Sequence, residues 1–256
     1  REKNQKKASL ASLKKEKMLM MQEVWNILCI FLGTPPTTFD WQFKDKKDKV
    51  HSFSNLTPKS FVKKHLPYKF SDQVCLINAP TKDKPFQKTY TVKFLGNVVE
   101  GEPIIYLNLP ISELKRTAIA SIKQNNAVWF GCDVGKEFHR ELGSLDMDIY
   151  DNELVFGTKF NLSKAQRLDY RQSLMTHAMV LSAVDLKNNK PKKWRIENSW
   201  GEKIGDKGYL VMTDAWFDEY LYETVVDKKF LTPKQRTLLK QKPKELAPWD
   251  PMGSLA

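Results

Sequence analysis

The spacing of apolar residues near the start of the chain predicts an amphipathic helix between residues 17 and 32. In this segment apolar side chains recur every three or four residues, which is the repeat of one helix face. They are Met18, Met21, Trp25, Leu28 and Leu32. Gly33 and Pro35 follow, and these residue types end helices. Further along, Thr57 and Pro58 are typical of a second helix start, with a hydroxyl cap and a proline in the first turn.

The middle and later parts of the chain predict strands. Short β-prone runs are separated by Pro, Gly and Asn, which mark turns. These runs cover residues 74–77, 90–95, 104–107, 127–130, 179–184, 193–198, 208–212 and 224–226. A helix is expected from Ser112, between the third and fourth runs. The order of elements predicts an α+β protein, in which a helical first part precedes a curled antiparallel β-sheet that forms a half-barrel.

We expect three parts in this chain. Residues 1–111 form a helical and insertion region, residues 112–231 an antiparallel β domain, and residues 232–256 a C-terminal arm rich in Lys and Pro. Neither an internal repeat nor a low-complexity block interrupts them. The bland interpretation of the arm is a disordered end, because termini without anchoring contacts are poorly ordered.

Composition and charge narrow the class of protein. The chain has 256 residues, of which 41% are hydrophobic and 28% charged, and this is a globular composition. With 42 Lys and Arg against 30 Asp and Glu, the net charge of +12 suggests non-specific nucleic-acid binding as one function. The longest apolar run, residues 24–32, is too short to span a membrane, and we expect neither a membrane partner nor a secretory signal.

The three cysteines favour a reducing, cytoplasmic compartment, because disulfide frameworks show an even and denser count. Cys29 and Cys75 sit in apolar runs and are expected to be buried and inert. Cys132 precedes Asp133, whose negative charge would raise the pKa of the thiol. Neither a CxxC motif nor a Cys/His cluster is present, so we expect no metal and no cofactor.

One histidine and one asparagine stand out from the pattern. His177 lies at the mouth of an apolar strand, and taken alone it is more typical of a satisfied core histidine than of a catalyst. Asn198 ends the next strand, beyond a Lys-rich loop at residues 186–193, so the two side chains are expected to meet across neighbouring strands. The Asn198 oxygen can accept the imidazole N–H, and Trp200 can shield that bond from water.

These segments resemble papain-like cysteine peptidases, whose signature contains a His-Ala pair and then Asn-Ser-Trp-Gly. The neighbouring sequence narrows the resemblance to the bleomycin hydrolase and aminopeptidase C group, which is cytosolic. Four segments carry it, at residues 128–136, 174–179, 197–202 and 247–253. The resemblance runs from about Lys15 to Ala256, and it implies a papain-like fold.

The resemblance also implies roles for individual residues. His177 is the catalytic general base, Asn198 orients its ring and Trp200 shields the site. Ala178 and Ala256 bind the peptide substrate, and the carboxylate of Ala256 meets the ammonium group at the substrate's N-terminus. The resemblance further implies a homo-oligomer, a hexamer with inward-facing active sites.

One departure from the family pattern is serious. The family's nucleophilic Cys begins a helix and has a Gln upstream, and no such segment occurs here; Cys29 lies late in its helix, where the dipole disfavours a thiolate. Because the chain opens on Arg1 and resembles the C-terminal half of the family, we expect an excerpt of a cysteine aminopeptidase, inactive alone. A basic nucleic-acid-binding protein and a non-catalytic scaffold on a peptidase fold stay open as alternatives.

Overall fold

The computed structural model describes residues 9–66, 69–96 and 101–254. The chain divides into two compact units, Arg1–Tyr68 and Lys69–Ala256. The predicted boundary at residue 111 falls inside the second unit, and the sheet of that unit runs across it.

Within residues 9–66, the first unit contains two helices and a hairpin: α2 (Leu10–Leu32), β1 (Phe39–Lys44), β2 (Val50–Leu56) and α3 (Pro58–His65). Helix α2 begins well before the predicted Lys17, because the Ser9 side chain caps it by accepting a hydrogen bond from the backbone N–H of Ser12. It ends at Gly33, as predicted, where φ is +82°. No residue of α2 is buried.

The hairpin and α3 are closed by local side-chain caps, and the predicted helix start at Thr57 is confirmed. Asp45 closes the turn between β1 and β2 by accepting hydrogen bonds from the backbone N–H groups of Lys47 and Lys49. Thr57 and Ser60 form a reciprocal capping box at the start of α3. Trp41 packs within a small cluster of aromatic rings from the hairpin and α3. Leu56 is the one buried residue among the described positions 9–66.

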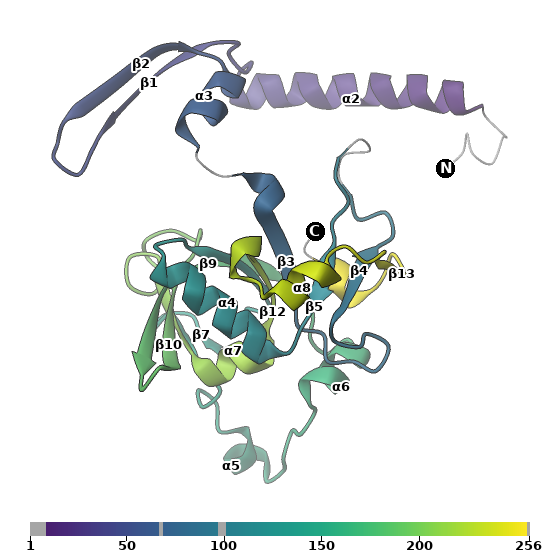
Figure 1. The fold of residues 1–256 in the computed structure, drawn as a ribbon, viewed down its shortest axis with the longest axis vertical. Coiled ribbons are helices and arrows are strands. Elements are labelled where there is room, and N and C mark those ends of the chain that lie inside the picture. The colour runs from purple at the N-terminus through teal and green to yellow at the C-terminus, as the bar shows by residue number, and fades with distance from the viewer. Residues whose placement is uncertain (1–8, 67–68, 97–100, 255–256) are drawn as a thin grey trace. The chain divides into compact units, whose positions relative to one another are not determined.

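The second unit is built on one sheet of 11 strands, in the order β13-β4-β5-β3-β12-β6-β9-β10-β11-β8-β7 (Figure 1). In chain order the strands are β3 (Gln73–Ile77), β4 (Lys88–Val92), β5 (Tyr106–Asn108), β6 (Val128–Cys132), β7 (Phe138–His139), β8 (Ser144–Leu145), β9 (His177–Lys187), β10 (Lys190–Glu197), β11 (Tyr209–Thr213), β12 (Leu221–Asp227) and β13 (Lys244–Leu246).

In residues 69–96 and 101–254, five helices and three short 3-10 turns accompany this sheet. The helices are α4 (Ile111–Lys123), α5 (Asn152–Phe156), α6 (Lys164–Asp169), α7 (Asp214–Tyr220) and α8 (Pro233–Leu238), and the 3-10 turns are Phe70–Asp72, Lys228–Phe230 and Pro251–Gly253. Helix α4 buries Leu114 and Ala118 against the sheet and packs on β12, β9 and β6. The mixed helix and sheet content expected of an α+β protein is confirmed. None of the described helices combines the length and apolar character that a membrane crossing requires.

The expected curled half-barrel of antiparallel strands is wrong in its details. The strand order gives an open sheet, with β13 and β7 at its two edges. Three strand pairs are parallel, β3 with β5, β4 with β13 and β8 with β11. Parallel neighbours need long connections, and the connections here bring strands together that lie far apart in sequence.

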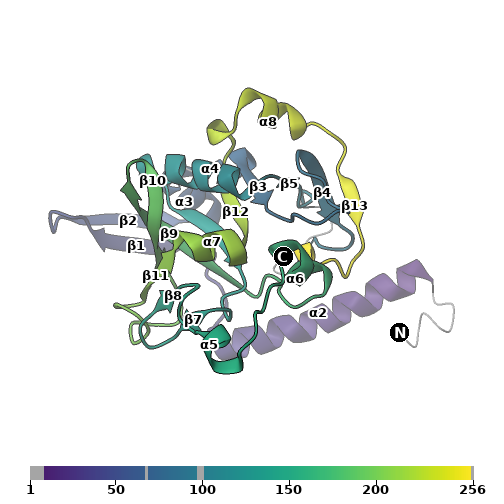
Figure 2. The same ribbon diagram turned by 90° about the horizontal axis from the view of Figure 1, so that it is seen from below.

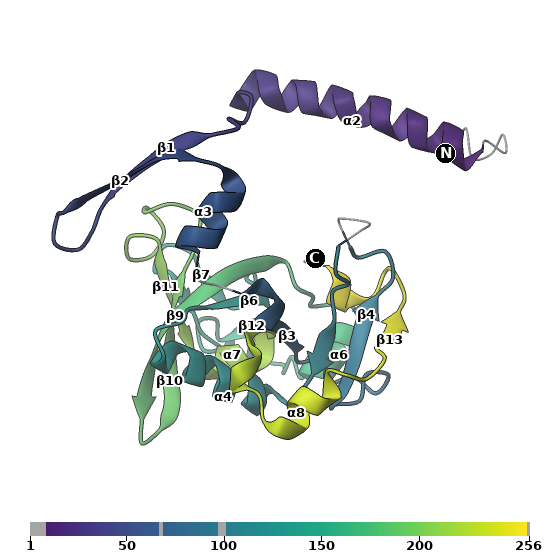
Figure 3. The same cartoon turned by 45° about the horizontal axis from the view of Figure 1, so that its top comes forward.

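The C-terminal arm is ordered structure through Ser254. Figures 2 and 3 show the chain running from α8 along one edge of the unit to β13, which lies beside β4. Beyond β13, Met252 is 1% exposed and packs in the smaller of the two apolar clusters of this unit, with Tyr90, Tyr106 and Tyr222. The larger cluster surrounds Trp194 and supports the end of the sheet that carries β9 and β10.

Candidate active site

The candidate site lies where β9 begins and β10 ends. These strands are antiparallel, and the two-residue turn that joins them places Asn188 and Asn189 at φ values of +53° and +61°. Asn adopts this left-handed region more readily than most residues, so the turn is encoded locally. His177 is the first residue of β9, and Asn198 directly follows β10. The tight turn therefore brings the first residue of β9 and the residue after β10 to the same end of this strand pair.

His177 and Asn198 are in contact. Nε2 of His177 lies 2.9 Å from Oδ1 of Asn198, as the sequence predicted. The same Oδ1 accepts a hydrogen bond of 2.8 Å from the backbone N–H of Ser199, which identifies it as the acceptor end of the amide. Nε2 must then be the donor. In the neutral ring the other nitrogen, Nδ1, is consequently the basic one.

Trp200 covers this hydrogen-bonded pair. Its ring stacks on the His177 imidazole at a centroid distance of 4.6 Å and an interplanar angle of 27°. The guanidinium of Arg140 lies 4.9 Å from the centroid of the Trp200 ring, and Phe138 packs against the indole at 6.1 Å. Both His177 and Asn198 are half-buried. The indole thus fixes the tilt of the imidazole while leaving the ring partly accessible.

Glycines shape the turn that follows Trp200. Gly205 has a φ of +63°, and a Cβ there would lie 2.2 Å from the backbone oxygen of Tyr209. Only glycine fits this position. The turn returns the chain so that the backbone oxygen of Gly208 accepts a hydrogen bond of 3.2 Å from the N–H of Asn198. The glycines of this motif therefore hold the backbone on which Asn198 sits.

The other predicted site residues lie in different surroundings. Ala178 is half-buried in β9 and pairs in register with Gly131 of β6. Ala256 falls outside the described residues, and its predicted role in substrate binding stays a prediction.

None of the three cysteines is poised to act as a nucleophile toward His177. Cys132 pairs with His177 in the sheet and is fully buried, and burial together with the Asp133 charge raises the pKa of its thiol well above the usual value. Burial, reinforced by Glu223, raises the pKa of Cys75 to about 12. Cys29 and Cys75 are half-buried, and not buried as predicted.

A polar network that was not predicted from the sequence fixes the segment just before His177. Ser173 donates a hydrogen bond of 2.8 Å to Oδ2 of Asp133, and Thr176 donates one of 3.2 Å to Oδ1. The hydroxyls of Ser173 and Tyr222 lie 2.6 Å apart. These bonds tie the residues before β9 to the end of β6. In the sequence, Ser173 and Thr176 lie three residues apart, but this spacing does not identify Asp133 as the acceptor of both hydroxyls.

The profile of the Peptidase C1-like family matches residues 1–253. This chain belongs to that family. The match covers the His177 and Asn198 segments together with the first unit and the arm, and it confirms the resemblance found in the sequence.

Relatives within the family are similar along nearly the whole chain. Bleomycin hydrolase of Mus musculus is 49% identical over 243 residues, which is 93% of this chain and 53% of that protein. Aminopeptidase C of Streptococcus thermophilus is 49% identical over 250 residues, covering 97% of this chain and 56% of its own length. The crystal structure of pepw from Lactobacillus rhamnosis superposes with a TM-score of 0.95 at 48% identity, covering all of this chain and 58% of that one. The chain thus spans about half the length of the relatives it matches.

Proposed function

We propose that the complete protein is a cytoplasmic cysteine aminopeptidase of the bleomycin hydrolase and aminopeptidase C type, and that these 256 residues form its C-terminal half. The observation that carries this proposal is the 2.9 Å bond between His177 Nε2 and Asn198 Oδ1, which leaves Nδ1 as the base. Family membership and the half-length match to the relatives support it. The nucleophilic thiol comes from a segment outside this chain.

Each residue then has a defined task in peptide hydrolysis. Nδ1 of His177 takes the proton of the thiol, and the ring later returns a proton to the departing amine. The same nitrogen next removes a proton from the water that attacks the acyl-enzyme. Asn198 holds the ring in this orientation throughout, and Trp200 excludes water from the bond between them. The small side chain of Ala178 leaves room for the substrate backbone beside the imidazole.

The C-terminal arm supports cleavage from the N-terminus of a peptide. Oγ of Ser254 donates a hydrogen bond of 2.7 Å to the backbone oxygen of Met175, two residues before His177. The last described residue of the arm is thereby held next to the strand that carries the proposed base. We place the carboxylate of Ala256 in the substrate cleft, where it pairs with the free ammonium group of the peptide and blocks longer N-terminal extensions.

The test uses the complete protein and an aminoacyl-aminomethylcoumarin substrate. His177→Ala should lower kcat/KM by about 10³-fold or more, because proton transfer by a positioned side chain contributes about 10²–10⁴-fold and the thiolate is lost as well. His139→Ala, in the same unit, is the matched control and should leave turnover near the parent value. Full turnover by His177→Ala would overturn the assignment of His177 as the base. A complete protein without a cysteine segment would instead favour the non-catalytic scaffold.

We also propose that the complete protein assembles with copies of itself. Helix α2 exposes an unusual amount of apolar surface, since Met18, Phe31 and Leu32 are 74%, 81% and 80% exposed. Exposed apolar patches of this kind mark interaction surfaces. Packing of α2 against another copy removes this surface from water.

A further inference from the structure

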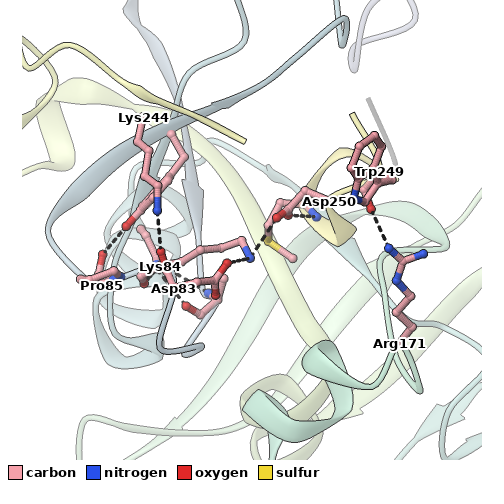
Figure 4. Close-up of polar contacts among 11 residues, drawn as sticks. Asp83, Lys84, Pro85, Arg171, Lys244, Trp249 and Asp250 are labelled. Carbon is pink, nitrogen blue, oxygen red and sulfur yellow. Dashed lines mark hydrogen bonds and ion pairs between the residues drawn. The ribbon is translucent and has the colours of Figure 1, made fainter. Parts of the chain in front are cut away.

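A buried lysine joins the C-terminal arm to the body of the second unit. Lys84 Nζ lies 3.0 Å from Oδ2 of Asp250 on the arm and 2.8 Å from Oδ2 of Asp83 (Figure 4). The side chains of Lys84 and Asp250 are 7% and 10% exposed, whereas that of Asp83 is 58% exposed. The pair between Lys84 and Asp250 is therefore largely out of water, and the pair with Asp83 is at the surface.

The body side of this pair is rigidly held. Lys84 lies in the loop between β3 and β4, and its backbone oxygen accepts a hydrogen bond of 2.7 Å from the side-chain amide of Asn108, which is fully buried. Burial alone would lower the pKa of Lys84, but hydrogen bonds with Asp83 and Asp250 outweigh burial and raise it. The ammonium therefore stays charged although its side chain is buried.

The arm side of the pair is held by the same carboxylate that begins its last turn. Oδ1 of Asp250 caps the 3-10 turn Pro251–Gly253 by accepting a hydrogen bond of 2.9 Å from the N–H of Met252, and Oδ2 faces Lys84. One residue earlier, the Trp249 backbone oxygen accepts a bond of 3.4 Å from Arg171. Four residues beyond Asp250, Ser254 donates its hydrogen bond to the backbone oxygen of Met175, two residues before His177. The position of Asp250 therefore sets the position of the arm's end.

Apolar packing holds the arm at Leu246 and Met252, but the segment between them borders a cavity. A cavity of about 210 Å³ lies between arm and body, bounded by Ala247, Trp249 and Pro251 on one side and by Leu168 and Arg171 on the other. The regular pairing of the arm is limited to β13, a three-residue strand parallel to β4. A buried ion pair is a weak source of net stability but a strong constraint on geometry, because separating its charges leaves each of them unpaired out of water. In this unit the ion pair constrains the arm where a cavity separates it from the body.

We propose that Lys84 and Asp250 are positioning residues for substrate choice: their ion pair fixes the end of the C-terminal arm beside His177, and thereby restricts the enzyme to peptides with a free N-terminus. This inference rests on the proposed aminopeptidase function and adds to it the ion pair that fixes the position of the arm. Without the pair, the arm's end moves away from His177 and peptide chains can extend past it.

The experiment compares two substrates in the complete protein, one peptide with a free N-terminus and the same peptide N-acetylated. Asp250→Asn keeps the oxygen that caps the last turn and removes the charge that faces Lys84. We expect the ratio of kcat/KM for the acetylated over the free peptide to rise by about tenfold or more. Asp83→Asn is the matched control, because it removes the other carboxylate of Lys84 and leaves the arm attached. It should leave the ratio unchanged.

A second variant distinguishes the loss of the ion pair from the effect of leaving the buried Lys84 charge unpaired. Lys84→Met with Asp250→Asn leaves neither charge behind, so this double variant should fold with a Tm near that of the parent and still show the raised ratio. A return to the parent ratio would overturn the inference, as would an equal loss of activity on both substrates in Asp250→Asn. Absence of turnover on both substrates by the unaltered protein would instead refute the proposed function.

Discussion

Trp25 on α2 is 48% exposed and Trp194 on β10 is 1% exposed, and the same contrast separates the two units throughout. Among the described residues of the first unit, Leu56 alone is buried. The second unit buries two apolar clusters, and Trp194 stacks beside Phe217 at a centroid distance of 4.8 Å in the larger one. The apolar side chains of the first unit are therefore mostly exposed, whereas those that form the two clusters of the second unit are buried.

The contrast shows which part of the molecule can hold a precise site. A helix gains most of its stability in proteins from packing of its apolar face, and no residue of α2 is buried. Its apolar surface therefore needs a partner. The sheet of the second unit has its own core, and the His177–Asn198 pair is built at the ends of two of its hydrogen-bonded strands.

The largest effect is expected from making the α2 surface polar. The triple variant Met21→Gln, Trp25→Gln and Leu28→Gln keeps good helix formers but removes three apolar side chains, each of which stabilises an interface by about 1.5–3 kcal/mol when fully buried. We expect the assembled complete protein to dissociate to monomers, as measured by analytical ultracentrifugation.

The control for this assembly test lies on the same helix. Lys14→Gln with Lys17→Gln alters polar residues of α2 and should leave the assembly unchanged. If the triple variant kept its sedimentation coefficient but unfolded more easily, another segment of the same chain, and not a second copy, would be covering α2.

A smaller effect is expected from a truncation in the core of the second unit. Trp194→Ala should lower the free energy of unfolding by about 3–5 kcal/mol, because it removes a fully buried indole and leaves a cavity. The same change at Trp25 should alter protection of the β9 and β10 amides by less than about 0.5 kcal/mol. Hydrogen exchange of those amides checks both values. Equal losses from the two variants would show that the units share one core.

Local signals explain why so much of the second unit could be predicted. The β-prone runs of β9 and β10 are hydrogen-bonded neighbours, and their spacing brought His177 and Asn198 together correctly. The predicted loop at residues 186–193 was too long, since β9 extends to Lys187 and β10 starts at Lys190. The Asn188–Asn189 pair carried the turn signal, because both residues adopt positive φ.

What could not be predicted depends on contacts between distant segments. Three residues of β13 carry no strand periodicity, and their pairing with β4 exists only after the arm has folded back. The sequence does not distinguish Lys84 and Asp250 from other charged residues, because only the folded chain buries both side chains. The burial of Cys29 was wrongly predicted because its apolar neighbours suggested a core, whereas no residue of α2 is buried.

The smallest effect concerns a carboxyl group that only the second unit could bury. Glu223 in β12 is 4% exposed, and burial raises its pKa to about 7, although a hydrogen bond with Cys75 acts in the opposite direction. An ordinary glutamate in the unfolded chain has a pKa near 4.5. Between these two values the folded protein holds a proton that the unfolded chain has released.

Stability should therefore fall as the pH rises from about 4.5 to about 7, and the loss should be complete above about 7. The Gln side chain of Glu223→Gln stays neutral at every pH. The free energy of unfolding of this variant should therefore equal that of the parent near pH 4 and exceed it near pH 8 by at most about 3 kcal/mol. Urea unfolding across this pH range measures the difference. Glu245→Gln, an exposed position of the same sheet, is the control and should follow the parent at every pH.

The first unit should respond to pH with the opposite sign. The hydrogen bond from His51 is the main cause that lowers the pKa of Asp45 below its usual 3.8. A carboxyl with a lowered pKa stabilises the fold above its unfolded pKa, and that contribution is lost as the pH falls through the lowered value. Acid should thus loosen the β1–β2 turn, whereas neutral pH weakens β12. If Glu223→Gln left the pH dependence of the second unit unchanged, the interior around β12 would be hydrated, and the contrast in burial between the two units would be smaller than their exposures indicate.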